Sequence, residues 1–485
     1  MSFKPGINFF GKLHHPAIGI RIPEIFLPGI TSALRQYHTA GGLMLSYGRE
    51  TSTEKIINAP LGKYPLSLGH TGTSIRFYLR EAQKWARRQK ISVELEADHL
   101  IIIGSPERAV KRIEGVFEKG RISSRQLEAS FRYNFSALRE ALSTVRVGCF
   151  TTDTSDLFNL EVDSWSKRER EKKFQKITDF RTRKELQARY LDRGFLLGAV
   201  DGAEYQVRFE WEEVIALYLK YQESLKANAR LYDYLRRRLG KNFGFEISMD
   251  ETEFLTPLKD ALFYLNEWTV SGRHFDYFAP NIGFKKRSDY TGSLSALERR
   301  VKKFSALCRY FDSALLSFHS GSGTSPWSGK GKEVYPVLLR ATGEKLKYKI
   351  SGVYYELLLE LLAGGKAGRS GLELFQEIFD RVYEFCWEQV RGGGELASPL
   401  LKKQLLKYER DLKAGRSKAR DCRADFFRFH SWLALTFRDE KGRRIYRQEL
   451  VELYQKNSRF RRVIDREVFA LTERLIRGLK FENNY

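Results

Sequence analysis

The sequence contains few cysteines and no long apolar run. Its four cysteines, Cys149, Cys308, Cys386 and Cys422, are widely separated and form no CxxC pair. This spacing excludes a zinc ribbon and predicts reduced thiols. No stretch of about 18 apolar residues occurs, so we expect no membrane span. The N-terminus lacks a charged start followed by a long apolar segment, so we expect no secretory signal and a cytoplasmic protein.

Two widespread catalytic motifs are also missing. Gly-x-Ser-x-Gly does not occur in a strand-to-helix context, which disfavours a serine hydrolase. The Gly/Ser-rich segment 321–331 lacks the Gly-Lys-Ser/Thr ending of a nucleotide-binding loop, and Gly392-Gly-Gly394 is too short for a dinucleotide fingerprint. These absences leave other reaction classes open.

Acidic residues are outnumbered by basic ones, 60 against 84, which gives a formal charge of +24. A basic protein can bind nucleic acid, but we favour solvated helix faces that carry both signs of charge. The excess of positive charge would also attract an acidic small molecule. The 30% charged fraction, with only three methionines, suggests a thermophilic source.

Strand and helix patterns alternate over residues 243–350, which predicts a parallel sheet with helical crossovers. Together with earlier segments they give about eight strand candidates, the number in a TIM-like (β/α)8 barrel. We expect helices at 75–88, 256–269 and 294–310, and another that opens at Ser105-Pro106. The expected strands include 64–70, 91–97, 145–153, 243–249, 275–279, 314–319 and 346–350.

The chain divides into three expected parts. Residues 1–60 have no clear period and are expected to form an N-terminal cap. Residues 61–395 should form the barrel, with a helical insertion around 160–240. Residues 396–485 should form a mostly helical segment that completes the barrel. The predicted fold is therefore an α/β barrel with additional helices and a helical C-terminal segment.

Three expected strands end in residues suited to chemistry. The first ends in Asp98-His99, the second in Asp250-Glu251 and Glu253, and the third in His319. Active sites of such barrels lie at the C-terminal ends of the strands, so we expect these ends to converge. Each has a simpler explanation: a histidine bonded to backbone, acids at a helix start, or a plain flexible loop.

The motifs together resemble the tagaturonate epimerase family. They are Ile247-Ser-Met-Asp250-Glu251-Thr-Glu253, Thr256-Pro257-Leu258, Ala279-Pro280, Asp289-Tyr290-Thr-Gly292-Ser-Leu294, Ser317-Phe-His319-Ser-Gly-Ser322, Tyr335-Pro336 and Lys349-Ile-Ser-Gly352-Val-Tyr-Tyr355. Asp98-His99-Leu100, Phe150-Thr-Thr-Asp153 and Phe429-His430-Ser are similar to other motifs of the family. The resemblance runs from about residue 64 to the end and is most specific over 243–355.

The resemblance implies a metal-dependent barrel epimerase that acts on keto-uronates. It gives acid/base roles to Asp98 and Glu251, and metal binding to His99 and His319. The family's third metal histidine falls in the segment where this chain has Lys347. A lysine is cationic at neutral pH, so the implied Zn²⁺, Mn²⁺ or Ni²⁺ would be weakly held, ligated differently or absent.

Further residues are expected to bind the substrate. They are Asp250, Ser320, Ser322, Lys347 and Lys349, with a lysine holding the carboxylate. Gly323 stands where the family usually has an acid. The leading hypothesis is a sugar-acid epimerase that uses a retro-aldol or proton-transfer route. The alternatives are an inactive relative that serves as a binding or regulatory protein, and a nucleic-acid-binding protein. The sequence does not indicate an oligomeric state.

Overall fold

A computed structural model describes residues 3–105, 108 and 122–485. The helix expected to open at Ser105-Pro106 lies largely outside the described residues. No helix in the described part of the chain is long and apolar enough to cross a membrane.

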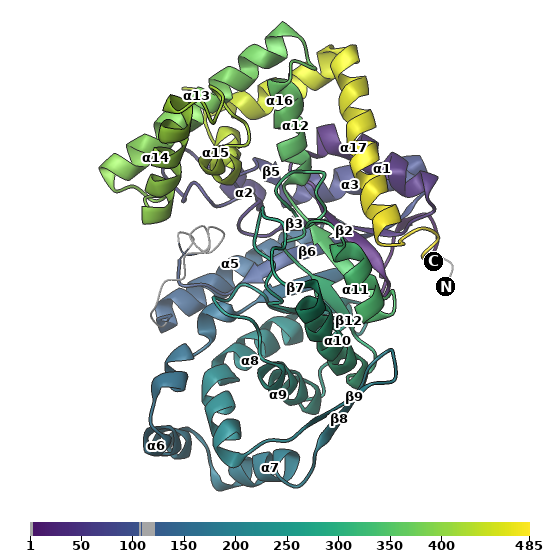
Figure 1. Ribbon diagram of the computed structural model, residues 1–485, viewed down its shortest axis with the longest axis vertical. Coiled ribbons are helices and arrows are strands. Elements are labelled where there is room, and N and C mark those ends of the chain that lie inside the picture. The colour runs from purple at the N-terminus through teal and green to yellow at the C-terminus, as the bar shows by residue number, and fades with distance from the viewer. Residues whose placement is uncertain (1–2, 106–107, 109–121) are drawn as a thin grey trace.

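Eight parallel strands close into a barrel, which confirms the predicted fold class (Figure 1). Each strand pairs with the next, and the last pairs with the first. In order around the ring they are β2 (His15–Gly19), β3 (Gly41–Ser46), β6 (Ser92–Ile101), β7 (Cys149–Asp153), β10 (Gly244–Met249), β11 (Tyr277–Pro280), β12 (Leu315–Phe318) and β13 (Leu346–Ile350). A short strand, β1 (Gly6–Ile7), pairs with the first residues of β6, Ser92 and Val93.

The first two barrel strands lie inside residues 1–60, which the sequence analysis assigned to a cap. β2 has five residues that begin His-Pro, and β3 begins Gly-Gly. Neither stretch carries the β-branched, alternating pattern that marks a strand, so periodicity did not reveal them. The strand expected at 64–70 is wrong, because these residues form turns. They lead into the short strand β5 (Thr73–Ser74), which pairs with β4 (Thr51–Ser52) beside α2 (Glu54–Ile57).

Helices pack around the outside of the barrel. They include α1 (Pro23–Gln36), α3 (Ile75–Gln89), α5 (Ser124–Leu142), α9 (Leu258–Val270), α10 (Leu294–Tyr310), α11 (Val334–Thr342) and α12 (Val353–Ala363). Their starts follow local chemistry: the Ser74 side chain accepts the Phe77 amide at the start of α3, and Ser293 accepts the Ala296 amide at α10. The predicted helices 75–88 and 294–310 are thereby confirmed.

Two additions extend the barrel at opposite ends of Figure 1. The lower one contains α6 (Lys167–Ile177), α7 (Phe180–Tyr190), the hairpin β8 (Phe195–Gly198) and β9 (Glu204–Val207), and α8 (Trp211–Leu239). The upper one contains α13 (Arg369–Gly392), α14 (Pro399–Lys413), α15 (Asp425–His430), α16 (Ile445–Lys456) and α17 (Ser458–Gly478). α17 packs closely on α1, where a Cβ on Gly29 would lie 2.7 Å from the Val468 side chain.

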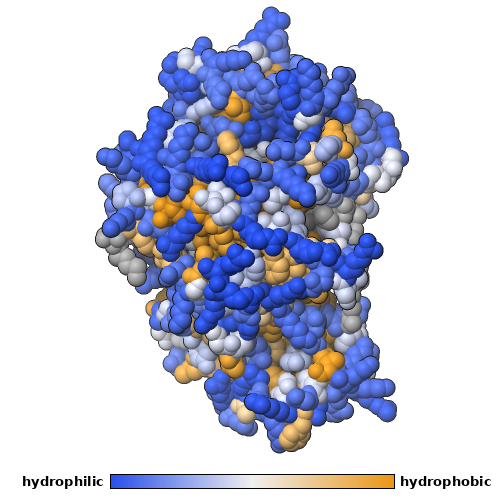
Figure 2. Space-filling model, turned by 180° about the vertical axis from the view of Figure 1, so that it is seen from behind, coloured by the Kyte–Doolittle hydropathy of each residue, from blue (hydrophilic) through white to orange (hydrophobic). Residues whose placement is uncertain are grey.

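The barrel interior is charged and the surrounding layer is apolar. Along β6, Val93, Leu95 and Ala97 belong to the hydrophobic core, while Glu94 and Glu96 alternate with them. Successive side chains of a strand point to opposite faces, so the acids point into the barrel. The outer surface seen in Figure 2 is mostly hydrophilic, and hydrophobic side chains gather mainly in one area at mid-height.

Candidate active site

The predicted strand ends converge at the C-terminal mouth of the barrel. Asp98 and His99 lie on β6, Asp153 ends β7, Glu251 follows β10 and His319 follows β12. All five side chains are buried. Parallel strands bring their C-terminal ends to one edge, as expected for this fold.

A distortion of β6 allows both Asp98 and His99 to face the mouth. The register with β7 shifts between Ala97 and Leu100, and His99 adopts a positive φ of 47°. Neighbouring residues of a regular strand would point apart, but a bulge re-aims a side chain. His99 Nε2 therefore lies 3.6 Å from Asp98 Oδ2. Its Nδ1 is buried and has no hydrogen-bond partner among the described residues.

His319 is held by carboxylates on both ring nitrogens. Nε2 lies 2.5 Å from Glu246 Oε1, and Nδ1 lies 2.9 Å from Asp250 Oδ1. Burial lowers the pKa of His319, but Asp250 and Glu246 outweigh it and raise the pKa to about 9. The two acids therefore favour the protonated form of this imidazole. The rings of His99 and His319 are 5.4 Å apart between centroids, so the sequence placed them together correctly.

Lys349 lies between two acids of the site. Its Nζ is 2.7 Å from Asp98 Oδ1 and 2.9 Å from Glu246 Oε1, and it donates to Thr151 Oγ1 at 2.6 Å. Burial alone would lower the pKa of Lys349, but the two carboxylates, Asp98 first, raise it above its usual value. Lys349 is therefore an ammonium that fixes the acids around it.

The pKa values of the two acids beside Lys349 shift in the opposite direction, below their usual range. Burial would raise the pKa of Asp98, but His99, Lys349 and His319 together hold it below its usual range. The pKa of Glu246 is held well below its usual range because its lysine neighbours and His319 outweigh burial. Both carboxylates are therefore ionised at neutral pH.

Glu251 is bound by two cations from different segments. Arg49, in the loop after β3, places Nη1 3.0 Å from Glu251 Oε1, and Lys286 places Nζ 2.7 Å from the same oxygen. Arg49 is buried and Lys286 is partly exposed. This arrangement sets a carboxylate and a reachable cation side by side at the mouth.

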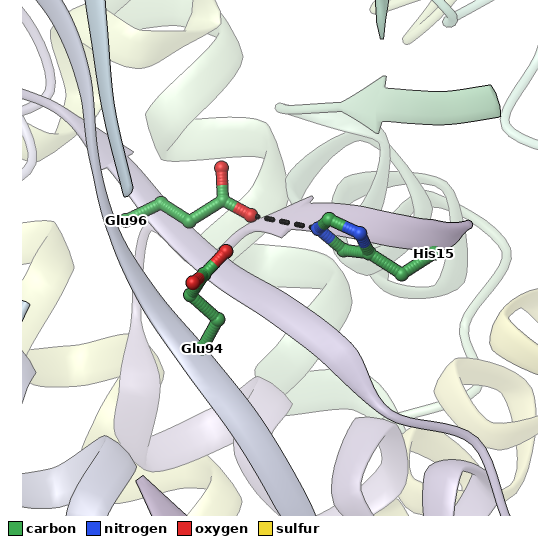
Figure 3. A group of neighbouring side chains, drawn as sticks. All are labelled: His15, Glu94 and Glu96. Atoms are coloured by element: carbon green, nitrogen blue, oxygen red, sulfur yellow. Dashed lines mark hydrogen bonds and ion pairs between the residues drawn. The ribbon is translucent and has the colours of Figure 1, made fainter. Parts of the chain in front are cut away.

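A second buried group lies deeper in the barrel. His15, Glu94 and Glu96 converge there, with His15 Nε2 3.2 Å from Glu96 Oε1 (Figure 3). Glu94 accepts the Phe10 amide at 2.8 Å. Burial and the neighbouring Glu96 raise the pKa of Glu94 well above its usual value, which favours the neutral form of this carboxyl.

Lys347 belongs to this deeper layer. Contrary to the expectation that it binds substrate, it has no exposed surface, and its ammonium pairs with Glu96 and with Glu246 Oε2, the latter at 3.0 Å. The reason is the two-residue alternation of β13, which puts Lys349 one layer nearer the mouth. Lys347 links the deep layer to the site through Glu246.

The donor sets decide where a divalent cation would fit. Two buried groups of described residues bring their ligand atoms within 4.8 Å of one another: His99, Asp153 and Glu251, and the deeper His15, Glu94 and Glu96. Each group already has a cation beside one of its acids: Lys347 contacts Glu96 in the deeper group, and Arg49 and Lys286 contact Glu251 in the mouth group. The mouth group offers one imidazole nitrogen and two carboxylates, a set that suits several divalent metals. This group contains His99, one of the two histidines expected to bind metal, and lies where the predicted strand ends converge; His319 lies beside it, between Glu246 and Asp250.

The loop after His319 is tightly built. Ser320 has a positive φ of 55°, and Ser322 Oγ accepts the Arg287 amide at 3.4 Å. At Gly323, a Cβ would lie 1.9 Å from Ser328 Oγ and 2.2 Å from Asp289 Oδ1, so both side chains would have to move to admit a larger residue. Lys330, from the same loop, is fully buried, and its ammonium donates to the Ser322 carbonyl at 3.1 Å.

Several residues of the site were absent from the predicted set, among them Lys286, which contacts Glu251. Arg49, Glu96, Asp153 and Glu246 all contact or adjoin predicted residues. The alternation of acids with apolar residues in Ser92–Asp98 was the available signal for Glu96. Asp153 ended a predicted strand in the same way as Asp98. Arg49 lies in a segment without a pattern.

Comparisons with known proteins agree with this architecture. A family model described as tagaturonate epimerase matches residues 113–391, more than half of the chain. The tagaturonate/fructuronate epimerase of Thermotoga maritima is 27% identical over 269 residues, which cover 55% of this chain and 51% of that protein. The chain thus matches about half the length of that relative.

Solved structures match over a larger span. The native structure of the fructuronate-tagaturonate epimerase from Cohnella laeviribosi superposes with a TM-score of 0.66 at 17% identity, and covers 98% of this chain and 83% of that one. A glycerol complex of the same protein gives the same values. At this identity the likeness supports the fold, and the family follows from the match over 113–391: this chain belongs to the tagaturonate epimerase family.

Proposed function

We propose that this protein is an epimerase that interconverts keto-uronates such as tagaturonate and fructuronate. Family membership and the printed names of its relatives support the substrate class. The observation that carries the proposal is the placement of two carboxylates, Asp98 and Glu251, beside His99 at the barrel mouth. Two acid/base groups around one substrate are what inversion of a carbinol centre requires.

The chemistry follows from the substrate. The inverted carbon is β to the ketone, so enolisation does not acidify its hydrogen. Loss of the proton from its hydroxyl instead breaks the bond between the α and β carbons, which gives an enolate and an aldehyde. The aldehyde turns over, the enolate carbon adds to its other face, and the new alkoxide takes up a proton. Atoms and charge balance without an oxidant.

The residues divide these tasks. Asp98 is ionised and removes the hydroxyl proton, and Glu251 serves the opposite face. The Lys349 ammonium stabilises negative charge on the reacting oxygens, because it is fixed before the substrate arrives. A divalent cation held by His99, Asp153 and Glu251 would supply Lewis-acid stabilisation of the same charge.

The substrate carboxylate has a matching cation at the mouth. Lys286 contacts Glu251 and keeps 28% of its side chain exposed, so it can reach an anion that enters the barrel. Ser320 and Ser322, with Asp250, are proposed to bind substrate hydroxyls. Lys347 takes no part in binding because it is enclosed below the site.

The protein is proposed to work in the cytoplasm. Its four cysteines are all free thiols, three of them buried, as suits a reducing compartment. A thermophilic source stays a prediction from composition.

Turnover by the purified chain tests the function. Tagaturonate and fructuronate would be supplied separately, with EDTA or with Zn²⁺, Mn²⁺ or Ni²⁺, and the sugars separated by chromatography. Reactions started from either sugar should reach the same final ratio of tagaturonate to fructuronate. The Asp98→Asn variant should lose activity while keeping its fold. No conversion in either direction with any of these metals would contradict the proposal.

A further inference from the structure

A second concave surface has a lining that shares no residue with the predicted site. It is a cavity of about 590 Å³ formed by α16, the segment that leads into it, and the loop around residues 57–72. Its lining includes Arg438, Arg443, Arg444, Arg447, Gln448, Glu452 and Gln455. Neither Asp98, Glu251 nor any other predicted site residue is among them.

The lining is strongly basic. It contains four arginines and one acid, Glu452. Glu452 is already paired, because the Lys456 ammonium lies 2.8 Å from its carboxylate. The charge of the cavity wall is therefore not neutralised from within the wall.

Two of the arginines have carboxylate partners outside the cavity lining. Arg443 Nε lies 2.7 Å from Asp439, and Arg447 Nη2 lies 2.9 Å from Glu24. These two guanidinium groups are neutralised locally. They leave Arg438 and Arg444 as the source of the excess charge.

Arg438 and Arg444 have no carboxylate partner among the described residues. Arg438 donates to the carbonyls of Ala59 and Ile57 at 2.7 and 3.0 Å. Arg444 donates to the carbonyls of Leu435 and His70 at 2.7 and 3.1 Å. Carbonyls fix the orientation of a guanidinium but do not cancel its charge.

The two charges also oppose each other. Burial, followed by the nearby charges of Arg438 and Arg447, lowers the pKa of Arg444 to about 9. Burial likewise lowers the pKa of Arg438. Two like charges held together in a partly buried wall are costly unless an anion joins them.

The helix direction adds to this field. Arg444 is the N-cap residue of α16, a helix of 12 residues, and Arg447 and Gln448 of its first turn line the cavity. The N-terminus of a helix carries partial positive charge and unpaired amides that favour anions. Fixed guanidinium forks match the oxygens of a phosphate group in particular.

We propose that this cavity is a binding site for the phosphate group of inorganic phosphate or of a phosphorylated small molecule, held between Arg438 and Arg444. Two uncompensated guanidinium charges match a dianion better than a monocarboxylate. The cavity is larger than a phosphate ion needs, so an ester with a sugar-sized group can also enter. The site is separate from the proposed epimerase chemistry and does not depend on it.

Calorimetric titration of the full chain at constant ionic strength tests the site, with inorganic phosphate and glucose 6-phosphate as probes and acetate as the monocarboxylate comparison. We expect saturable binding of a phosphate probe, tighter than that of acetate. Binding of inorganic phosphate, with or without glucose 6-phosphate, assigns the phosphate group itself, and binding of glucose 6-phosphate alone assigns a phosphorylated small molecule. Saturable binding of neither, or equally tight binding of acetate, would overturn the proposal.

Charge insertion tests the location without breaking the carbonyl contacts of the arginines. Gln448→Glu and Gln455→Glu each add a negative charge to the wall and should weaken phosphate binding about tenfold, as expected for a unit charge about 6 Å from a dianion in water. Gln83→Glu, on α3 and outside the cavity, is the matched control. Circular dichroism checks that each variant folds. Unchanged binding in both cavity variants, or equal weakening in the control, would place the site elsewhere and overturn the proposal.

Discussion

Replacing Lys349 by methionine removes the ammonium that joins two acids of the site. The change deletes two ion pairs, to Asp98 at 2.7 Å and to Glu246 at 2.9 Å, and the bond to the Thr151 hydroxyl. Breaking a buried pair by removing one partner costs about 3–5 kcal/mol, since a buried charge is left uncompensated. Glu246 keeps Lys347 at 3.0 Å, while Asp98 keeps only the weaker contact with His99 at 3.6 Å. We therefore expect a loss of about 3 kcal/mol at pH 7.

The loss should depend on pH in a defined direction. The folded-state pKa values of Asp98 and Glu246 are depressed, so their contribution to stability is present above the ordinary carboxyl pKa of about 4 and is lost as pH falls below it. Without Lys349, Asp98 takes up a proton more easily. The loss of stability in the variant should therefore be full at pH 7 and should shrink as pH falls below about 4.

Urea unfolding followed by circular dichroism measures this deficit. Lys345→Met is the matched control, because Lys345 is an exposed lysine just before the same strand. It should change the free energy of unfolding by less than about 0.5 kcal/mol. A Lys349→Met variant as stable as this control, or one with the same loss of stability at pH 7 as at about pH 3, would refute the electrostatic reasoning.

Three other outcomes are expected. Asp98→Asn and Glu251→Gln should each lower kcat about 10²–10⁴-fold, measured on protein that circular dichroism shows to be folded, because each removes one acid/base group; each also breaks a buried ion pair and should lower the unfolding midpoint. A folded variant with the parental kcat would count against these roles. The ring protons of His319, followed by NMR, should titrate near pH 9; titration near 6.5 would show that its carboxylate contacts do not persist. Glu94→Gln should cost less stability than Glu96→Gln, because burial and Glu96 already favour the neutral form of Glu94, whereas Glu96→Gln should cost about 3 kcal/mol by leaving Lys347 short of a partner; equal losses would contradict this difference between the two acids.

Much of the outer barrel could be predicted from the sequence. Leu294–Tyr310 and Leu346–Ile350 were placed correctly because capping chemistry and apolar patterning mark them directly. β2 and β3 were not, because His15–Gly19 and Gly41–Ser46 are short, contain glycine or proline and are buried on both faces. Such strands depend on their neighbours in the ring, which no local pattern encodes.

The sequence predicted only part of the site, because residues at strand ends can be recognised locally whereas contacts between distant segments cannot. Asp98, His99, Glu251 and His319 stand at strand ends, where the fold requires functional groups to converge. The sequence could not show how deep Lys347 lies in the barrel. The alternation of side chains along a strand indicates which face a residue takes, but not its depth within the barrel. Nor could the sequence show that His319 has both nitrogens occupied, because Glu246 lies 73 residues away along the chain.

Epimerisation in D₂O tests the central claim most directly. Tagaturonate would be incubated with the purified chain, and the product examined by proton NMR. The account predicts fructuronate that keeps its original hydrogen on the inverted carbon, because the retro-aldol route breaks a carbon–carbon bond and leaves that hydrogen in place. Deuterium at the inverted carbon, or no fructuronate at all with Zn²⁺, Mn²⁺ or Ni²⁺ present, would contradict it.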